Sequence, residues 1–216
     1  DRAVASLAQA CIRTGHIIVV DHADLPYVAK MPVTVIRPKT NNGYAAGISA
    51  GLVAAKKLGA VSSDIYIVLN NDAVVRQGSL EALLRWWGSN GMPGMLAGAR
   101  YGRVSPWSGR AVITFEQPRS HFGAISYIHG ASLIGEYGML TRIAMPVDLF
   151  LYCEDVIISM AVLQSGCALR LIPGFRVEHD DRIAPLSLQA LYYLVRNGAY
   201  VMERHPLLLW RGYWRF

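Results

Sequence analysis

Hydrophobic residues in the first ninety positions alternate between short β-branched runs and longer segments with helical spacing. The apolar run that begins at Tyr66 and ends at Leu69 predicts a strand that is covered on both faces. Similar runs predict strands over 17–21 and 33–37, and helical spacing predicts helices over 1–14, 78–87 and from the loop at 41–43 to about residue 58. This alternation indicates an α/β fold with a parallel sheet.

Beyond residue 90 the sequence becomes rich in glycine and its pattern less regular. The predicted elements there are strands over 95–99, 111–115, 126–134 and 168–172 and helices over 156–164 and 186–204. The irregular part between about 100 and 125 is where we expect an acceptor-binding surface, because binding residues concentrate on loops.

Polar side chains follow several of the predicted strands. Asn70, Asn71 and Asp72 come directly after the run at 66–69, and His179 ends a short β-branched run. In open α/β sheets ligands bind at the carboxyl ends of strands, and a carboxylate beside amides suits Mg²⁺ or Mn²⁺ bound to a diphosphate. A solvated turn is the alternative interpretation of an isolated Asn-Asp pair.

Composition narrows the class of protein. The 216 residues are 53% apolar and 17% charged, which fits one domain with a substantial core. The apolar run at 156–163 is far shorter than the roughly 18 residues of a spanning helix. Three scattered cysteines form neither a disulfide framework nor a zinc pattern, so we expect a cytoplasmic protein.

The net charge of +6 is partly concentrated in residues 191–216, which favours an anionic partner. No nucleic-acid-binding motif accompanies this charge, so nucleic acid is not the expected partner. The last segment, 206–216, mixes tryptophan, leucine and arginine, as interfacial elements do. We therefore expect peripheral contact with the inner membrane, with packing of this segment against the domain as the alternative.

Six short motifs occur in a recognisable order. They are Ile18-Val19-Val20-Asp21, Asn42-Gly43-Tyr44-Ala45-Ala46-Gly47, Leu69-Asn70-Asn71-Asp72, Glu154-Asp155, Val177-Glu178-His179 and Tyr192-Tyr193 followed by Arg196-Asn197. Together they resemble the family 2 glycosyltransferases of GT-A fold, especially the bacterial rhamnosyltransferase-like branch. The resemblance covers most of the chain.

This resemblance implies a fold and a domain organisation. The fold is a Rossmann-like, mostly parallel central sheet flanked by helices, with a C-terminal helical extension. Residues 1–185 would form the GT-A domain, and 186–216 the final helix and a basic aromatic tail. The first strand of the family has no counterpart ahead of the helix at 1–14, so we expect about ten or more upstream residues to supply it.

The resemblance also implies a reaction, which is the inverting transfer of a sugar from a nucleoside diphosphate to a hydroxyl. It matches Asp155 to the catalytic base and Glu154 to a residue that orients the acceptor or the base. Asp72 and His179 match the ligands of Mn²⁺ or Mg²⁺. The donor would be a dTDP- or UDP-linked sugar such as rhamnose, and the acceptor a glycan or lipid-linked glycan in bacterial surface polysaccharide assembly.

Residues that the resemblance places near the nucleotide come from three predicted loops. They are Asp21, Arg37, Asn42, Gly43 and Asn71.

Two alternatives remain open. A sugar nucleotidyltransferase also uses an α/β sheet and Mg²⁺, although no glycine-rich basic loop for a triphosphate is visible. The second alternative is a catalytically inert nucleotide-sugar or glycan-binding module, because the sequence departs from the family at Asp21-His22-Ala23-Asp24 and has a single carboxylate in Asn70-Asn71-Asp72.

Overall fold

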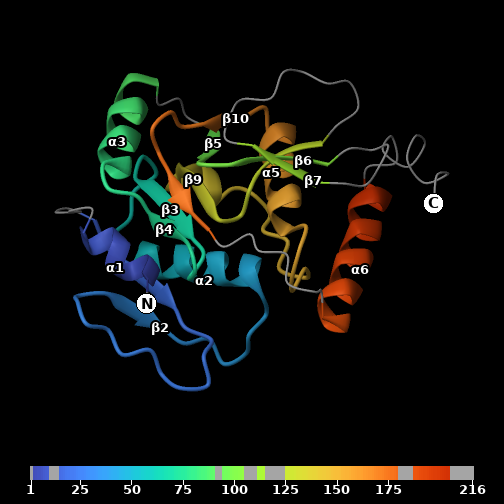
Figure 1. Ribbon diagram of the computed structural model, residues 1–216, viewed down its shortest axis with the longest axis horizontal. Helices are drawn as coiled ribbons and strands as arrows, with labels where there is room; N and C mark the ends of the chain where they lie inside the picture. Colours follow the sequence, from blue (N-terminus) through green and yellow to red (C-terminus); the bar gives the residue numbers. More distant parts are fainter. Residues whose placement is uncertain are drawn as a thin grey trace.

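The computed structural model describes residues 2–9, 15–90, 94–104, 111–114, 125–179 and 187–204 (Figure 1). Its helices are α1 (Arg2–Gln9), α2 (Tyr44–Lys57), α3 (Ser79–Asn90), α4 (Tyr137–Leu140), α5 (Glu154–Gln164) and α6 (Leu188–Arg204). Its strands are β1 (Ile18–Val20), β2 (Thr34–Ile36), β3 (Ile65–Leu69), β4 (Val74–Val75), β5 (Met95–Gly98), β6 (Tyr101–Val104), β7 (Ala111–Thr114), β8 (Ile125–Ile128), β9 (Ser132–Glu136), β10 (Ala168–Leu171) and β11 (Val177–Glu178). The helix predicted over 1–14 is confirmed for α1, and residues 10–14 lie outside the described part.

A four-stranded sheet forms the centre of the molecule, with the strand order β10-β5-β9-β3. Strands β10 and β5 are parallel, as the sequence predicts, whereas β9 runs antiparallel to both of its neighbours. The α/β class with a helix-flanked sheet is therefore confirmed, and the pairing is more mixed than expected. The single strand predicted over 126–134 is wrong, because the chain turns at 129–131 and forms β8 and β9 instead.

Both faces of the sheet are covered. Neighbouring residues of β9 point to opposite faces: Leu133 packs in a cluster with residues of α2 and α5, and Ile134 packs in a second cluster with residues of α3. Both side chains are fully buried, with exposed fractions of 1% and 0%. The residues of β3 are half-buried rather than fully buried as predicted, because β3 is the last strand of this sheet within the described residues.

Besides the central sheet, the described residues form one three-stranded antiparallel sheet, with the order β7-β6-β8, and two two-stranded sheets. Strands β1 and β2 form a parallel pair, and β4 pairs antiparallel with β11 so that Val74 lies opposite Glu178. This second pairing carries His179, at the end of β11, toward Asp72, which precedes β4. Within the described ranges β1 and β3 are not paired with each other, and the expected strand between them remains a prediction.

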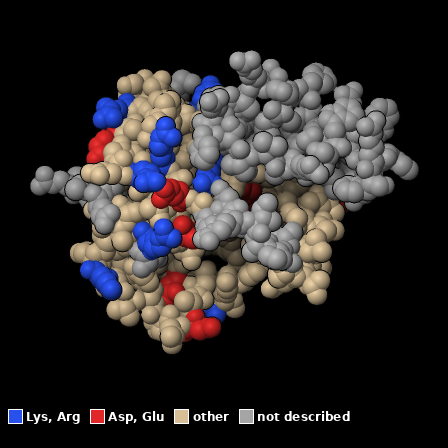
Figure 2. Space-filling view, viewed as in Figure 1, with Lys and Arg blue, Asp and Glu red and all other residues tan. Residues whose placement is uncertain are grey.

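Helix α6 lies at the edge of the molecule opposite α3 (Figure 1). Among the helices that the structure describes, none is long and apolar enough to cross a bilayer. The tail at 206–216, for which membrane contact is predicted, lies outside the described residues. On the face shown in Figure 2, lysine and arginine side chains are interspersed with aspartate and glutamate.

Gly43 allows close approach between the start of α2 and the chain ahead of α5. Its φ angle is 88°, and a Cβ atom at this position would overlap the backbone of Phe150. Gly59 has a similar φ of 91°, but a Cβ atom there would meet no other atom within 4 Å. Comparing the two glycines therefore separates backbone strain from steric overlap.

We expect Gly59→Ala to lower the free energy of unfolding by about 1–2 kcal/mol, the cost of a left-handed alanine. Gly43→Ala should cost at least about 1–3 kcal/mol more, because the methyl group also displaces the backbone of Phe150. Urea unfolding of both variants and the parent measures the difference. Equal losses would show that the two segments are not in close contact.

Candidate functional site

Asp155 lies at the start of α5, where its carboxylate is held by backbone amides. The N–H of Gly130 donates to Oδ2 at 2.9 Å, and the N–H of Val156 donates to Oδ1 at 2.8 Å. Burial raises the pKa of Asp155 to about 6, and these hydrogen bonds oppose part of that rise. The carboxylate is therefore oriented by the backbone and remains basic enough to take a proton near neutral pH.

Glu154 directly precedes Asp155 in the first turn of α5. Burial, and then the neighbouring charge of Asp155, raise the pKa of Glu154 to about 7. Its Oε2 atom is buried and accepts no hydrogen bond within the described part of the chain. A buried acceptor without a partner is costly, which makes this oxygen a candidate to bind a polar group of a ligand.

The turn at 129–131 holds Asp155 in place, and sequence reasoning missed it. Gly130 donates its N–H to Asp155 and accepts a hydrogen bond from the hydroxyl of Tyr44 at 2.5 Å. Burial and the two carboxylates raise the pKa of Tyr44 well above its ordinary value, so the phenol stays protonated and donates. The available signal was an isolated glycine within a strand pattern, which often marks a bend or a close approach.

Asp72 and His179 form a second group, brought together by the pairing of β4 with β11. Oδ1 of Asp72 lies 3.3 Å from Nε2 of His179, and the amide nitrogen of Asn70 lies 3.2 Å from the same Nε2 atom. The side chain of Asp72 is 55% exposed and that of His179 only 14%. One open carboxylate and one sheltered imidazole thus face the same point.

These two side chains fit neighbouring positions around a divalent cation. Adjacent ligands of an octahedral ion with bonds of about 2.1 Å are about 3.0 Å apart, and the observed separation is 3.3 Å. No cluster of three or more His, Cys, Asp or Glu residues that could hold an ion is found among the described residues. The pair would therefore hold a cation together with oxygen atoms of a ligand.

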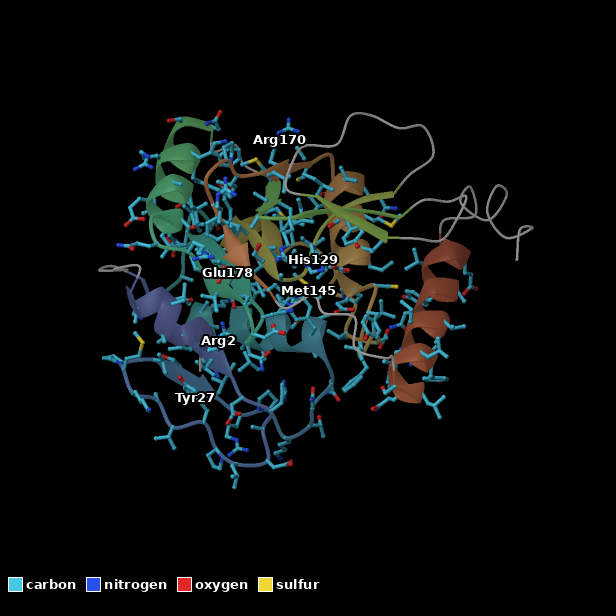
Figure 3. All side chains as sticks on the ribbon, viewed as in Figure 1. Arg2, Tyr27, His129, Met145, Arg170 and Glu178 are labelled. Atoms are coloured by element: carbon cyan, nitrogen blue, oxygen red, sulfur yellow. The ribbon has the colours of Figure 1, made fainter. Side chains whose placement is uncertain are left out.

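The two groups meet at His129. Its ring lies edge-on to that of His179, with 5.6 Å between the ring centroids, and the next residue, Gly130, donates to Asp155. The Nδ1 atom of His129, which is labelled in Figure 3, accepts the N–H of Ala131 at 3.2 Å, and this contact fixes the ring. The turn at 129–131 therefore lies between the carboxylates of α5 and the Asp72–His179 pair.

Asp21 and Arg37, predicted near the nucleotide, interact with each other and with the loop after β1. The carboxylate of Asp21 accepts the N–H of Ala23 at 3.0 Å and of Tyr27 at 2.9 Å, and Nε of Arg37 lies 3.3 Å away. The two N–H donors lower the pKa of Asp21. Asp21 is only 6% exposed, so the main effect of its carboxylate is to shape this loop.

The remaining predicted nucleotide residues are placed differently. Asn42 and Asn71 are exposed, whereas Gly43 packs on the backbone of Phe150. The loops at 105–110 and 115–124, where an acceptor surface is predicted, lie outside the described residues.

Comparison with known proteins identifies the fold. No protein family profile and no curated protein matches the sequence. Among solved structures, the chain is similar to a crystal structure of GalNAc-T7 with UDP, GalNAc and Mn²⁺, with a TM-score of 0.57 and 17% identity over 79% of this chain. The matched region spans 36% of the GalNAc-T7 chain. This likeness supports the GT-A fold predicted from the sequence.

Weaker matches include a UTP-bound UGPase from Acinetobacter baumannii, with a TM-score of 0.38 and 17% identity over 82% of this chain and 65% of that one. A UDP-glucose pyrophosphorylase matches with a TM-score of 0.35 and 18% identity, over 84% of this chain and 67% of that one. Likenesses this weak do not bear on the function of the chain.

The raised pKa of Glu154 predicts a particular dependence of stability on pH. Between the ordinary glutamate pKa of 4.5 and the folded value of about 7, the folded chain binds more protons than the unfolded chain. Stability should therefore fall as the pH rises through this window. Glu154→Gln removes this titration. Over the same pH range, we expect the free energy of unfolding of the variant to fall by at least about 1 kcal/mol less than that of the parent.

Urea unfolding at about pH 4.5 and about pH 7.5 measures this difference. Glu81→Gln, which changes an exposed acid in the first turn of α3, is the matched control and should follow the parent. Parallel behaviour of the parent and Glu154→Gln would contradict the prediction.

Proposed function

We propose that this chain is the catalytic domain of an inverting glycosyltransferase that moves a sugar from a nucleoside diphosphate to an acceptor hydroxyl. The observation that carries the proposal is the placement of a half-buried, amide-held Asp155 on one side of the 129–131 turn and the Asp72–His179 pair on the other. Such a transfer needs a base for the acceptor and a separate site for the leaving diphosphate. GalNAc-T7, which shares the fold, was crystallised with UDP, GalNAc and Mn²⁺.

Asp155 acts as the base in this mechanism. The acceptor oxygen attacks the anomeric carbon from the face opposite the diphosphate and forms the new C–O bond. The bond to the diphosphate breaks, its electron pair leaves with the diphosphate, and the proton of the acceptor goes to Asp155. With a pKa of about 6, Asp155 is ionised at neutral pH before this step.

Glu154 orients the acceptor. Its buried Oε2 accepts no hydrogen bond from the described residues, and a hydroxyl of the acceptor supplies the missing donor. The surroundings of the two carboxylates differ, and so do their roles. Backbone N–H groups hold Asp155 and oppose the rise of its pKa, whereas Glu154 has the higher pKa and is more readily protonated.

Asp72 and His179 would hold a Mn²⁺ or Mg²⁺ ion together with oxygens of the donor. Such an ion would supply positive charge to stabilise the departing diphosphate. Residues of the loops around β1, β2, α2 and β3 bind the nucleotide in this proposal: Asp21, Arg37, Asn42, Gly43 and Asn71. Asp21 does so through the loop that its carboxylate organises.

The finer assignment follows the sequence motifs. We place the chain in the rhamnosyltransferase-like branch of the family 2 glycosyltransferases, with a dTDP- or UDP-linked hexose as donor. A glycan or lipid-linked glycan of the bacterial cell envelope is the acceptor. Residues 1–185 form the catalytic domain and 186–216 a C-terminal extension. The tail of this extension, 206–216, contacts the inner membrane.

Replacing the base separates chemistry from donor binding. We expect Asp155→Asn to lower transfer by at least about a hundredfold, since an amide cannot take the acceptor proton. Affinity for the nucleoside diphosphate, measured by calorimetry, should stay near that of the parent. Asp64→Asn, at an exposed position outside the site, is the control and should transfer normally.

Two outcomes would contradict the proposed function. A parent protein that binds nucleotide sugars but transfers none to a panel of glycan acceptors would be a binding module. A parent that instead forms nucleotide sugar and pyrophosphate from a nucleoside triphosphate would be a nucleotidyltransferase.

The metal assignment predicts overlapping effects. We expect Asp72→Ala and His179→Ala each to weaken Mn²⁺-dependent binding of nucleoside diphosphate, and the double variant to lose little more than either single one, because both side chains serve one ion. Thermal shifts with dTDP, UDP and GDP, with and without Mn²⁺, measure base preference and metal dependence together. Full activity in excess chelator would exclude a metal at this pair.

A further inference from the structure

Helix α6 contacts the backbone segment that leads into the carboxylates of α5. Asn197 of α6 is fully buried, and its amide nitrogen donates to the carbonyl oxygens of Leu151 at 2.6 Å and Tyr152 at 3.0 Å. Its Oδ1 atom accepts a hydrogen bond from Nε of Arg196 at 2.8 Å. The side chain amide is therefore satisfied by this segment and by its own neighbour.

The segment that Asn197 holds is strained. Tyr152 and Cys153 have φ angles of 66° and 67°, in the left-handed region that residues other than glycine rarely adopt. Two such residues in succession persist only where surrounding contacts enforce them. Cys153 is also the N-cap of α5 and makes no side-chain cap hydrogen bond, so the direction in which the helix starts depends on this turn.

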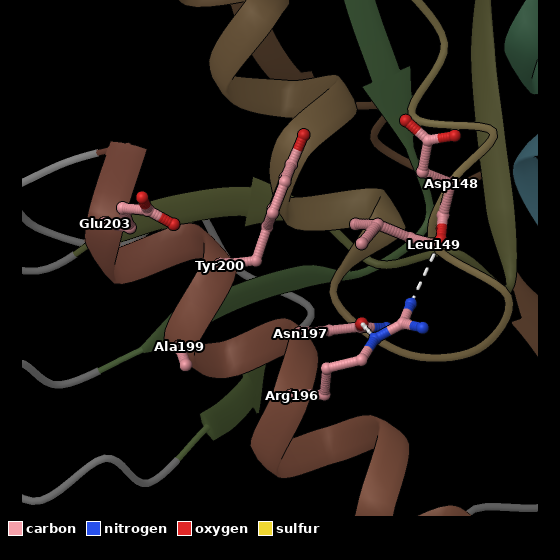
Figure 4. A pocket seen from close by; sticks show the side chains of 7 residues that line it. All are labelled: Asp148, Leu149, Arg196, Asn197, Ala199, Tyr200 and Glu203. Atoms are coloured by element: carbon pink, nitrogen blue, oxygen red, sulfur yellow. Dashed lines mark hydrogen bonds between the residues drawn. The ribbon is translucent and has the colours of Figure 1, made fainter.

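Apolar packing fills this interface incompletely. A pocket of about 550 Å³ that is open to solvent lies between α6 and the chain at 148–149, and it is shown in Figure 4. The residues that line it are Asp148, Leu149, Arg196, Asn197, Ala199, Tyr200 and Glu203. Beside the pocket, Arg196 donates to the carbonyl oxygen of Asp148 at 3.0 Å. Polar contacts to the backbone thus accompany the ring contact between Phe150 and Tyr193 in connecting α6 to this segment.

We propose that Asn197 is a positioning residue, which holds the left-handed turn at Tyr152 and Cys153 and thereby directs Asp155 toward the N–H of Gly130. Asn197 acts through the turn and touches no reacting atom. The catalytic consequence rests on the proposed function of Asp155 as a base. This role of Asn197 also makes α6 part of the catalytic unit, although α6 begins at Leu188, after the last described strand, β11, has ended at Glu178.

The test compares Asn197→Ala with Val201→Ala. Val201 lies on the same helix, is 6% exposed and packs with Tyr127 and Val156, so its truncation weakens the attachment of α6 without removing the hydrogen bonds to 151 and 152. We expect Asn197→Ala to lower kcat about tenfold to a hundredfold, because small errors in the position of a base are costly. Val201→Ala should lower the melting temperature comparably and keep kcat within about twofold of the parent.

Affinity for the donor distinguishes positioning from general damage. Calorimetry with nucleoside diphosphate and Mn²⁺ should give dissociation constants within about twofold of the parent for both variants, since the Asp72–His179 pair is untouched. If Asn197→Ala does not fold, Asn197→Ser, which removes less volume, is judged by the same criteria. Retention of the parent kcat, or equal losses of kcat in the asparagine and valine variants, would overturn the inference.

A second measurement needs no activity. In the parent the N–H of Gly130 is bonded to Asp155, so its hydrogen exchange, followed by NMR, reports the position of that carboxylate. Exchange at Gly130 should be faster in Asn197→Ala than in Val201→Ala. Unchanged exchange would overturn the positioning role, whereas a parent that transfers no sugar would contradict only the proposed function.

Discussion

The candidate site depends on two adjacent carboxylates, Glu154 and Asp155, that are both half-buried. Burial favours the neutral form of both, and the closeness of the two groups adds to the effect on Glu154. Two backbone N–H groups offset part of this cost at Asp155, while Oε2 of Glu154 has no such partner among the described residues. Similar side chains in different surroundings thereby acquire different proton affinities, which allows two neighbouring carboxylates to take different roles.

This arrangement is maintained by backbone geometry supplied from elsewhere in the chain. Tyr44 at the start of α2 and Gly130 in the turn after β8 fix one side of Asp155. Gly43 allows the backbone at Phe150 to pass close to α2, and Asn197 fixes the next two carbonyl groups. The chemistry of the site therefore depends on residues that carry no charge themselves.

The sequence predicted best what local patterns determine. Helices α2, α3, α5 and α6 and strands β1, β2, β3 and β10 lie within a few residues of their expected positions, because their periodicity and stop signals are local. It also singled out Asp72 and His179, which the structure places 3.3 Å apart.

Features that depend on contacts between distant parts of the chain could not be predicted from local patterns. The division of 126–134 into β8 and β9 depends on pairing β9 with β3 and β5, and the importance of Gly130 appears only once that turn meets α5. The internal partners of Asp21 were also hidden, because an acidic residue after a strand looks the same whether it binds a ligand or the following loop. The likeness to GalNAc-T7, at 17% identity, supports the architecture without identifying these contacts.

The hydrogen bonds at the site join parts of the chain that are far apart in sequence, and this affects how the site forms. Tyr44 and Gly130 are 86 residues apart, and Asn70 and His179 are 109 residues apart. Closing such long loops costs chain entropy, which the contacts offset only once they have formed. These hydrogen bonds therefore form only after much of the sheet is in place. Recovery of ligand binding during refolding should consequently follow the slowest structural phase, and isolated helices or hairpins of this protein would carry the right residues without forming the site.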